Sequence, residues 1–246
     1  MKILVTNDDG IYSPGLAALA KVAARFGEVI VVAPDVEQSS MGHAITHARP
    51  FSLKKSPVMF NQVEAFRVNG TPADCVALGT HLYAKTDLIL SGINFGYNLG
   101  NSMWHSGTLA GARQAVLLGI KGIALSTTTG EKGPDFDALE PHVEKTLKVL
   151  IEDSAFGLYN VNIPPNPAGI QWTRQSVRFY DGKIVPGMDP IGRKHYWFTV
   201  TPLAHAEEGT DRWAIEQGHI SITPLRLDLT NEDALRKISS QIDTTF

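Results

Sequence analysis

The start of the chain constrains its fold more than any other segment. The apolar run Ile3-Leu4-Val5 is typical of a buried strand, and the strand ends in Asn7-Asp8-Asp9-Gly10. Ser13 and Pro14 predict that a helix begins next, because serine is a good N-cap and proline suits the first helical position. A strand, an acidic turn and a helix make half of a βαβ unit. Ligands of open parallel sheets bind beyond the carboxyl ends of strands, so the two carboxylates lie where such a fold has its chemistry.

Asp8 and Asp9 are adjacent, and two neighbouring carboxylates repel each other unless a positive charge lies between them. A hard divalent cation such as Mg²⁺, Mn²⁺ or Ca²⁺ would supply that charge, because these ions prefer oxygen ligands. A plain polar turn is the alternative, since Asn, Asp and Gly dominate turns for purely local reasons. This stretch alone leaves both readings open.

Apolar strands and amphipathic helices alternate up to about residue 165. This alternation predicts an α/β fold with a mostly parallel sheet that helices cover on both faces. Two β-like pieces, near residues 50–54 and 65–68, are expected to form a hairpin at the sheet edge. The other strands are predicted near residues 3–6, 29–33, 87–90, 122–126 and 158–163, and the helices over residues 14–26, 72–83, 109–116 and 136–151.

The alternation fades after residue 165. Trp172, Tyr180 and residues 196–198 lie in β-like stretches, residues 184–190 are rich in turn formers, and residues 218–225 predict a strand. A closing helix is expected from Asn231 to about residue 242. We therefore expect a single domain over residues 1–246. Its catalytic core would span about 1–165, and its β-rich C-terminal extension, about 166–246, would be an oligomerisation arm with a terminal helix.

The loop over residues 35–47 follows the second strand, so it faces the same crevice as the acidic turn. The hydroxyl of Ser39 could ligate a hard metal or hold a phosphate oxygen, or it could simply be solvated. His43, His47 and His105 lie in or beside the crevice loops. Each could be a general acid or a phosphate contact, or an ordinary surface or core histidine.

The segment Ser91–Gly100 alternates Gly with Asn, and such a loop lets backbone N–H groups approach a ligand closely. Ser106-Gly107-Thr108 then precedes a small-residue helix, with Ser106 or Thr108 as its N-cap. Free N–H groups and the helix dipole make this end suitable for an oxyanion or a phosphate, although the three residues could also do nothing beyond capping.

Asp74 and Cys75 need no functional explanation. Thr71, Pro72 and Asp74 form a typical helix start, with the carboxylate in the first turn. Cys75 lies in an apolar helical pattern and is expected to be a small buried residue. As the only cysteine, it rules out an intramolecular disulfide and fits a reducing compartment.

Composition and motifs narrow the function. A net charge of -3 offers no basic surface for polymeric DNA or RNA. No signal peptide and no membrane-length apolar run is found, which leads us to expect a cytoplasmic protein without a membrane partner. There is no P-loop, no Gly-x-Ser-x-Gly elbow and no Gly-x-Gly-x-x-Gly after the first strand, and the last absence argues against a dinucleotide-binding domain.

Taken together, the motifs resemble one family. They are Asn7-Asp8-Asp9-Gly10 with Pro14-Gly15, Val32-Ala33-Pro34-Asp35 with Gln38-Ser39, Gly70-Thr71-Pro72-Ala73-Asp74-Cys75, Ser91-Gly92-Ile93-Asn94 with Asn98-Leu99-Gly100, Ser106-Gly107-Thr108, Thr210-Asp211 and Ser221-Ile222-Thr223-Pro224-Leu225. Their order and spacing over nearly the whole length resemble the SurE family of metal-dependent 5′(3′)-nucleotidases.

The resemblance implies a three-layer Rossmann-like fold and phosphatase activity on nucleoside monophosphates. It implies one Mg²⁺ or Mn²⁺ per subunit, held by Asp8, Asp9, Ser39 and Asn94. It also implies homodimers or homotetramers that exchange a C-terminal arm or helix. With the loop pattern, it leads us to expect Asp8 and Asp9 to be catalytic, and the phosphate to be held by Asn94, Asn98, Ser106, Gly107 and Thr108.

Alternatives remain at this stage. Water activated by the metal could attack the phosphorus, with Asp8 or Asp9 orienting or deprotonating it, or one aspartate could attack and form an aspartyl-phosphate. Two other functions also fit an acidic strand end: a nucleotide sensor that binds without releasing phosphate, and a metal-dependent nucleotide-sugar transferase.

Overall fold

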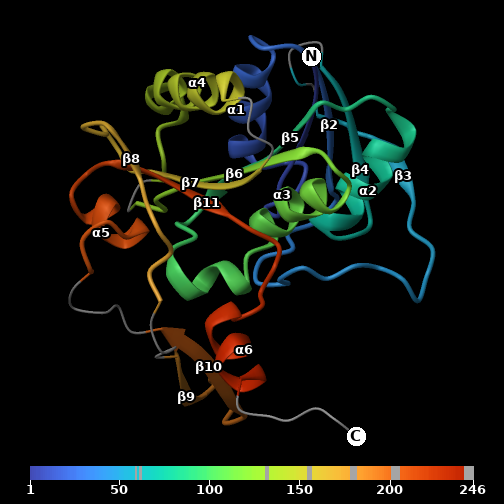
Figure 1. Cartoon of the computed structure of the whole chain (residues 1–246). Coiled ribbons are helices and arrows are strands. Elements are labelled where there is room, and N and C mark those ends of the chain that lie inside the picture. Colours follow the sequence, from blue (N-terminus) through green and yellow to red (C-terminus); the bar gives the residue numbers. More distant parts are fainter. Residues whose placement is uncertain are drawn as a thin grey trace, which may run out of the picture.

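A central sheet with helices on both faces organises the molecule (Figure 1). The computed structural model describes residues 1–58, 60, 63–130, 133–153, 157–177, 182–200 and 206–240. Within these residues the sheet has nine strands in the order β3-β4-β2-β1-β5-β6-β7-β11-β8. The strands are β1 Lys2–Thr6, β2 Glu28–Pro34, β3 Leu53–Lys55, β4 Glu64–Val68, β5 Leu88–Phe95, β6 Lys121–Thr127, β7 Leu158–Ile163, β8 Ile170–Trp172 and β11 Ile220–Leu225.

The sheet is mostly parallel, as predicted. β1 pairs in parallel with both β2 and β5, and the parallel order continues through β6 to β7. β3 runs antiparallel to β4 at one edge, which confirms the expected edge hairpin. β11 is antiparallel to β7. The carboxyl ends of β2, β1, β5 and β6 therefore meet at one edge of the sheet.

Alternating side chains of each buried strand pack against opposite helical layers, which makes the fold a three-layer α/β sandwich. Ile3 and Val5 face the cluster under α1 (Pro14–Ala23) and α4 (Phe136–Glu152), whereas Leu4 faces the cluster with α2 (Pro72–Leu82). The helix α3 (Gly107–Leu117) lies beside α2 on that second face (Figure 1). Within the described residues, no helix has the length and apolar character that crossing a membrane requires.

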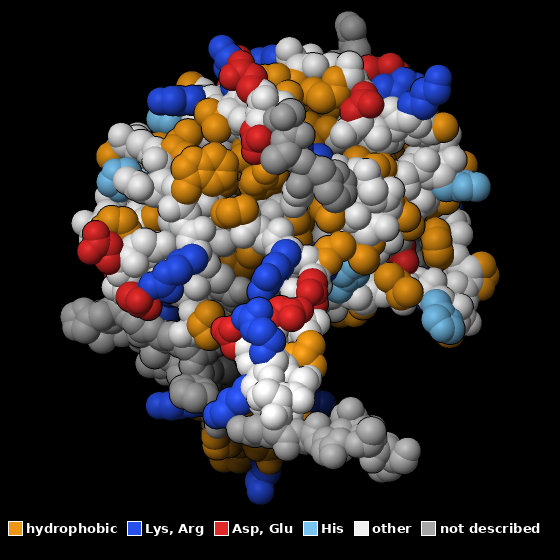
Figure 2. Space-filling model, in the orientation of Figure 1, with side chains coloured by type: hydrophobic (Ala, Val, Ile, Leu, Met, Phe, Trp, Pro, Cys, Tyr) orange, Lys and Arg blue, Asp and Glu red, His pale blue; other side chains and the backbone are white. Residues whose placement is uncertain are grey.

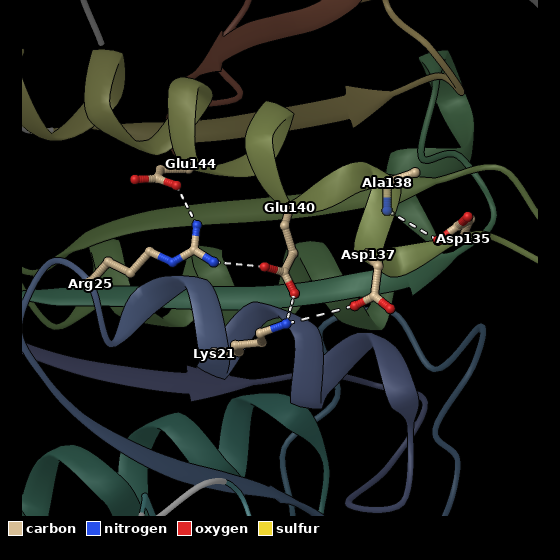
Figure 3. Close-up of polar contacts among 7 residues, drawn as sticks. All are labelled: Lys21, Arg25, Asp135, Asp137, Ala138, Glu140 and Glu144. Atoms are coloured by element: carbon tan, nitrogen blue, oxygen red, sulfur yellow. Dashed lines mark hydrogen bonds and ion pairs between the residues drawn. The ribbon is translucent and has the colours of Figure 1, made fainter.

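Ion pairs link α1 to α4 across the outer surface (Figure 3). Glu140 accepts from both Lys21 and Arg25, and Arg25 also reaches Glu144. Half-exposed ion pairs of this kind add little to stability, because water and salt screen them. The apolar contacts beneath them hold the two helices together.

The C-terminal part contributes β8 and β11 to the sheet and then projects away from it (Figures 1 and 2). The short helix α5 (Asp211–Glu216) packs against β11, whereas the hairpin of β9 (Gly182–Met188) and β10 (Lys194–Val200) forms a sheet of its own, and the helix α6 (Glu232–Ser239) follows β11. Hydrophobic side chains on the hairpin and α6 are exposed: Ile184, Val185, Met188, Tyr196, Trp197, Phe198, Leu235 and Ile238.

Two sequence-based expectations about local structure were wrong. Residues 184–190, expected to be turns, mostly belong to β9, because a two-stranded ribbon consists only of edge strands and these tolerate Pro186. The helix expected to run to residue 26 ends at Ala23. Gly27 instead allows the chain to pass close to Met1, whose carbonyl oxygen would lie 2.1 Å from an added Cβ. Asn231 caps α6 as expected, while Tyr180 and the predicted helix end at residue 242 lie outside the described residues.

Candidate active site

The acidic turn after β1 is held by its own asparagine. The Asn7 side chain is fully buried, its Nδ2 donates to the carbonyl of Gly10, and the N–H of Gly10 donates back to its Oδ1. Gly10 adopts φ +91, a conformation that residues with a side chain rarely take. This closed turn presents the two intervening residues, Asp8 and Asp9, at the sheet edge.

Asp8 lies against the N-terminus of α3. Its side chain is 4% exposed, and its Oδ1 accepts a 2.6 Å hydrogen bond from the hydroxyl of Thr108. Burial raises the pKa of Asp8 above the ordinary value, although the hydrogen bonds from Thr108 oppose that shift. Gly107 leaves room for the carboxylate, since an added Cβ would stand 2.9 Å from Oδ2. One oxygen of Asp8 is thus committed to Thr108.

Asp9 is less tightly held. Its one hydrogen bond within the described residues is a long one, 3.4 Å from the N–H of Phe95 to Oδ2. Burial, together with the neighbouring charge of Asp8, raises the pKa of Asp9 to about 7. A buried and a half-buried carboxylate with raised pKa values, side by side, form an arrangement that a bound cation would stabilise.

The loop after β5 brings Asn94 and Asn98 to the same edge. Asn94 is buried and donates through Nδ2 to the carbonyl of Gly96, at 2.7 Å, which leaves its Oδ1 as the oxygen that could ligate a metal. Asn98 donates through Nδ2 to Ser126, at 2.9 Å, and to Thr108, at 3.4 Å. The amide of Asn98 therefore supports Thr108. Direct contact between Asn98 and a phosphate stays a prediction.

Ser106 is the N-cap of α3, which settles one alternative left open by the sequence. Its Oγ accepts from the N–H of Leu109, at 3.0 Å, while Thr108 belongs to the first turn of the helix. The hydroxyl of Thr108 is bonded to Asp8 instead. In this structure the N-terminus of α3 thus binds a carboxylate of the chain itself.

The loop after β2 reaches the same edge. The N–H of Gln38 donates to the carbonyl of Asp8 at 2.7 Å, which brings the exposed Ser39 next to the acidic turn. Farther along, His43 pairs with Gln114 of α3 at 2.9 Å. Within the described part of the chain, Ser39 makes no hydrogen bond to either aspartate, so its role as a metal ligand stays a prediction.

The structure also places the remaining residues considered in the sequence analysis. His47 and His105 are exposed. Asp74 closes a capping box with Thr71, as expected, and it also accepts from the N–H of Thr46 in the loop after β2. Cys75 is fully buried, and burial raises the pKa of its thiol well above the ordinary value, which suits a structural residue.

Sequence reasoning missed three buried residues that hold the loop after β5. Asn160 and Asn162 of β7 bond to the backbone of Asn98, and Asp211 accepts from the N–H of Gly100 at 2.8 Å. A signal was present for the first two. Asparagine is rare in a fully buried strand, and buried amides need partners.

The donor set at the acidic turn suits a hard divalent cation. The candidates offer carboxylate, amide and hydroxyl oxygens at neighbouring strand ends, the ligands that Mg²⁺ and Mn²⁺ prefer. Within the described residues, no cluster of three or more His, Cys, Asp or Glu side chains suited to a metal is present. With two carboxylates at the turn, such an ion would also need neutral oxygens, for which Ser39 and Asn94 are the candidates, and water or substrate.

Comparisons with known proteins agree with this geometry. The family model described as "Survival protein SurE" matches residues 3–182. The chain is 44% identical to "5'-nucleotidase SurE 1" of Thermus thermophilus, over 99% of this chain and 98% of that protein. It is 46% identical to "5'-nucleotidase SurE" of Geotalea uraniireducens, over 96% of each.

The fold comparison gives the same answer. The crystal structure of the SurE protein from Aquifex aeolicus matches with a TM-score of 0.83 and 38% sequence identity, covering 99% of this chain and 100% of that one. The family model ends at residue 182, whereas the Thermus thermophilus relative and the solved structure also cover the C-terminal elements. The chain belongs to the SurE family.

Proposed function

We propose that this chain is a metal-dependent phosphatase that hydrolyses nucleoside 5′-monophosphates, and 3′-monophosphates as well, to nucleoside and phosphate. The observation that carries the proposal is the contact between Asp8 of the acidic turn and Thr108 at the N-terminus of α3, with Asp9 beside it. Through this contact, a carboxylate pair suited to a cation lies next to a helix end suited to an anion. The 5′-nucleotidase names of relatives that match along nearly the whole chain support the same function.

One Mg²⁺ or Mn²⁺ per subunit would bind to Asp8, Asp9, Ser39 and Asn94. When bound, it would neutralise charge on the phosphoryl group and lower the pKa of a water molecule. The two carboxylates are held differently: the hydroxyl of Thr108 fixes Asp8, whereas Asp9 has, within the described residues, a single long hydrogen bond from Phe95. Either carboxylate could orient the attacking water or accept its proton, and Asp9 has more room to do so.

The phosphate would be held at the N-terminus of α3 by Ser106, Gly107 and Thr108, with Asn94 and Asn98 supporting it. The helix dipole and the free N–H groups at this end favour an anion. Asp8 is already bonded there, so an incoming phosphate meets a carboxylate. Two anions at one helix end repel each other, and this repulsion is a physical reason for the site to require a cation.

The decisive experiment measures phosphate release from a panel of nucleoside 5′- and 3′-monophosphates. EDTA-stripped protein is compared with the same protein after addition of MgCl₂ or MnCl₂. Metal-dependent release supports the proposal and ranks the substrates. Tight nucleotide binding without release would indicate a sensor, and release only onto an added acceptor would indicate a transferase.

Asp8→Asn and Asp9→Asn test the same site within the chain. Both substitutions keep the side-chain shape and remove the charge, so we expect losses of several orders of magnitude in kcat with the fold retained. Turnover close to that of the unmodified chain in either variant would contradict the assignment. Trapping a phosphorylated aspartate during turnover would favour the aspartyl-phosphate route over direct attack by water.

We further propose that the whole chain acts as one domain whose C-terminal extension joins copies into a homodimer or homotetramer. An isolated two-stranded hairpin is marginal in water, and β9–β10 presents Trp197 with 64% of its surface exposed. Apolar surface of this kind marks an interface. Light scattering should give a dimer or tetramer, and Trp197→Glu should shift it toward monomer while the exposed Trp172→Glu should not.

A further inference from the structure

A chain of buried hydrogen bonds connects β7 to the acidic turn. Asn162 forms two bonds with the backbone of Asn98: its Oδ1 accepts from the N–H at 2.8 Å, and its Nδ2 donates to the carbonyl at 3.2 Å. Asn160 donates a second hydrogen bond to that carbonyl, at 2.8 Å. All three residues are buried, and the two β7 asparagines have no exposed surface. The backbone of Asn98 is therefore clamped from β7.

The side chain of Asn98 transmits this constraint toward Asp8. Its Nδ2 donates to Ser126 and to the hydroxyl oxygen of Thr108. A hydroxyl that accepts from an amide keeps its own proton free to donate, and Thr108 donates it to Oδ1 of Asp8 at 2.6 Å. The donors thus run in one direction, from β7 to Oδ1 of the Asp8 carboxylate.

The stability of the fold alone does not explain why an asparagine occupies position 160. Its Oδ1 is buried and has no hydrogen-bond partner within the described residues. The amide cannot be reversed to relieve this, because its oxygen would then face the carbonyl of Asn98. An unpaired buried acceptor destabilises the folded state, and an apolar side chain of similar size would avoid that cost. Only its Nδ2 makes a hydrogen bond, and that bond leads toward the site.

We propose that Asn160 and Asn162 are positioning residues of the active site, which set through Asn98 and Thr108 the orientation of the Asp8 carboxylate toward metal and phosphate. This inference rests on the proposed function. The two asparagines would act through the backbone of Asn98, without touching substrate or metal themselves. Partners of this kind behind a metal ligand govern its orientation, and their loss commonly lowers metal affinity or activity 10–100-fold, in round figures.

Asn160→Leu is the most informative variant. It removes the bond to Asn98 and also the unpaired acceptor, while Asn162 still clamps the loop. We expect a urea midpoint equal to or above that of the unmodified chain. We also expect kcat for AMP to fall about tenfold and the Kd for Mn²⁺ to rise about tenfold. Asn160→Ser also removes the side-chain amide that bonds to Asn98, and its smaller side chain serves if leucine does not fit.

Thr223→Val is the matched control. Thr223 lies on β11 directly opposite Asn160, is equally buried and bonds to Thr173, outside the chain of bonds to Asp8. We expect it to leave kcat and Mn²⁺ affinity unchanged. If Asn160 has a merely structural role, kcat and Mn²⁺ affinity should fall only as far as the urea midpoint falls, in Asn160→Leu and Thr223→Val alike. That result would overturn the inference.

Calorimetric titration with MnCl₂ separates this inference from the proposed function. If the unmodified chain binds Mn²⁺ but releases no phosphate, the proposed function fails, and the Mn²⁺ affinity of Asn160→Leu still decides the positioning role. Unchanged Mn²⁺ affinity and kcat in a folded Asn160→Leu or Asn160→Ser overturn the inference while leaving the phosphatase intact. If the unmodified chain neither binds Mn²⁺ nor releases phosphate, both fail together.

Discussion

Gly107 lies directly against the side chain of Asp8: a Cβ added to Gly107 would stand 2.8 Å from the Cβ of Asp8 and 2.9 Å from its Oδ2. The contact joins the first residue of α3 to the acidic turn after β1, and these residues are about a hundred positions apart in sequence. Only glycine allows the helix end to approach the carboxylate this closely. The first prediction follows from this contact.

Gly107→Ala should displace the Asp8 carboxylate by a few tenths of an ångström or more. Misplacement of a catalytic group by about 1 Å can cost about a hundredfold in rate, so we expect this smaller displacement to lower kcat/KM for AMP about tenfold. Steady-state phosphate release measures it. Leu117→Ala, at an exposed site on the same helix, is the control and should behave like the unmodified chain. Normal activity in Gly107→Ala would mean that Asp8 is not constrained at this contact.

Thr108→Val removes the hydroxyl that holds Oδ1 of Asp8 while keeping the side-chain shape. A hydrogen bond to a charged group contributes about 1.5–3 kcal/mol, which corresponds to a loss of about 10–100-fold in kcat/KM if the bond persists in the transition state. Thr108→Ser retains the hydroxyl and should recover most of the activity. Normal activity in Thr108→Val with a loss in Thr108→Ser would instead point to packing of the methyl group, which valine keeps and serine lacks.

Local chemistry allowed much of the fold to be predicted. Ser13-Pro14 and Thr71-Pro72 mark two helix starts that the structure confirms, and the apolar strands fall where expected. Cap and strand signals lie within a few residues of the element they define, so a sequence shows them directly. The error at β9 has the same origin, because Pro186 and Gly187 favour a turn locally while their place in an edge ribbon depends on pairing with β10.

The contacts that orient the candidate site could not be predicted from the sequence. Asn98 and Asn160 are separated by 62 positions, and Thr108 and Asp8 by 100. Motif order predicts that these residues gather at one sheet edge, but it does not predict which polar atom bonds to which. For example, the sequence did not predict that the Nδ2 of Asn98 donates to Ser126 and Thr108, and its role as a phosphate contact stays a prediction.

Asp9→Asn should change how the stability of the metal-free protein depends on pH. The pKa of Asp9 is about 7 in the folded chain, and about 3.9 is ordinary for an unfolded one. Between these values the folded state binds the extra proton, so its free energy of unfolding falls as pH rises through about 4 to 7. Asn cannot ionise, so the variant should lose the part of this slope that Asp9 contributes and gain stability relative to the unmodified chain at pH 8.

Urea unfolding in EDTA at pH 5.5 and pH 8 measures the effect. Added MnCl₂ should then stabilise the unmodified chain at pH 8 far more than the variant, because a bound ligand stabilises only the state that binds it. If the free energy of unfolding depends on pH in the same way in both proteins without metal, Asp9 does not have the raised pKa assigned to it.

Asp211 tests whether the C-terminal part supports the site. Its carboxylate is fully buried and accepts from the N–H of Gly100 at 2.8 Å and of Ser176 at 3.0 Å. Asp211→Ala leaves these buried donors without an acceptor, at about 1–3 kcal/mol each. Because Gly100 ends the loop that carries Asn98, we expect both a lower urea midpoint and a lower kcat at temperatures where the variant is still folded.

Two comparisons complete this last test. Asp211→Asn keeps one acceptor oxygen, and the losses should be intermediate, whereas Glu208→Ala, at an exposed position of the preceding loop, should change neither stability nor turnover. A stable Asp211→Ala with normal kcat would show that β7 alone positions the loop. A destabilised Asp211→Ala whose folded fraction retains normal kcat would confine Asp211 to folding, and would place control of the Asp8 carboxylate with Asn160 and Asn162.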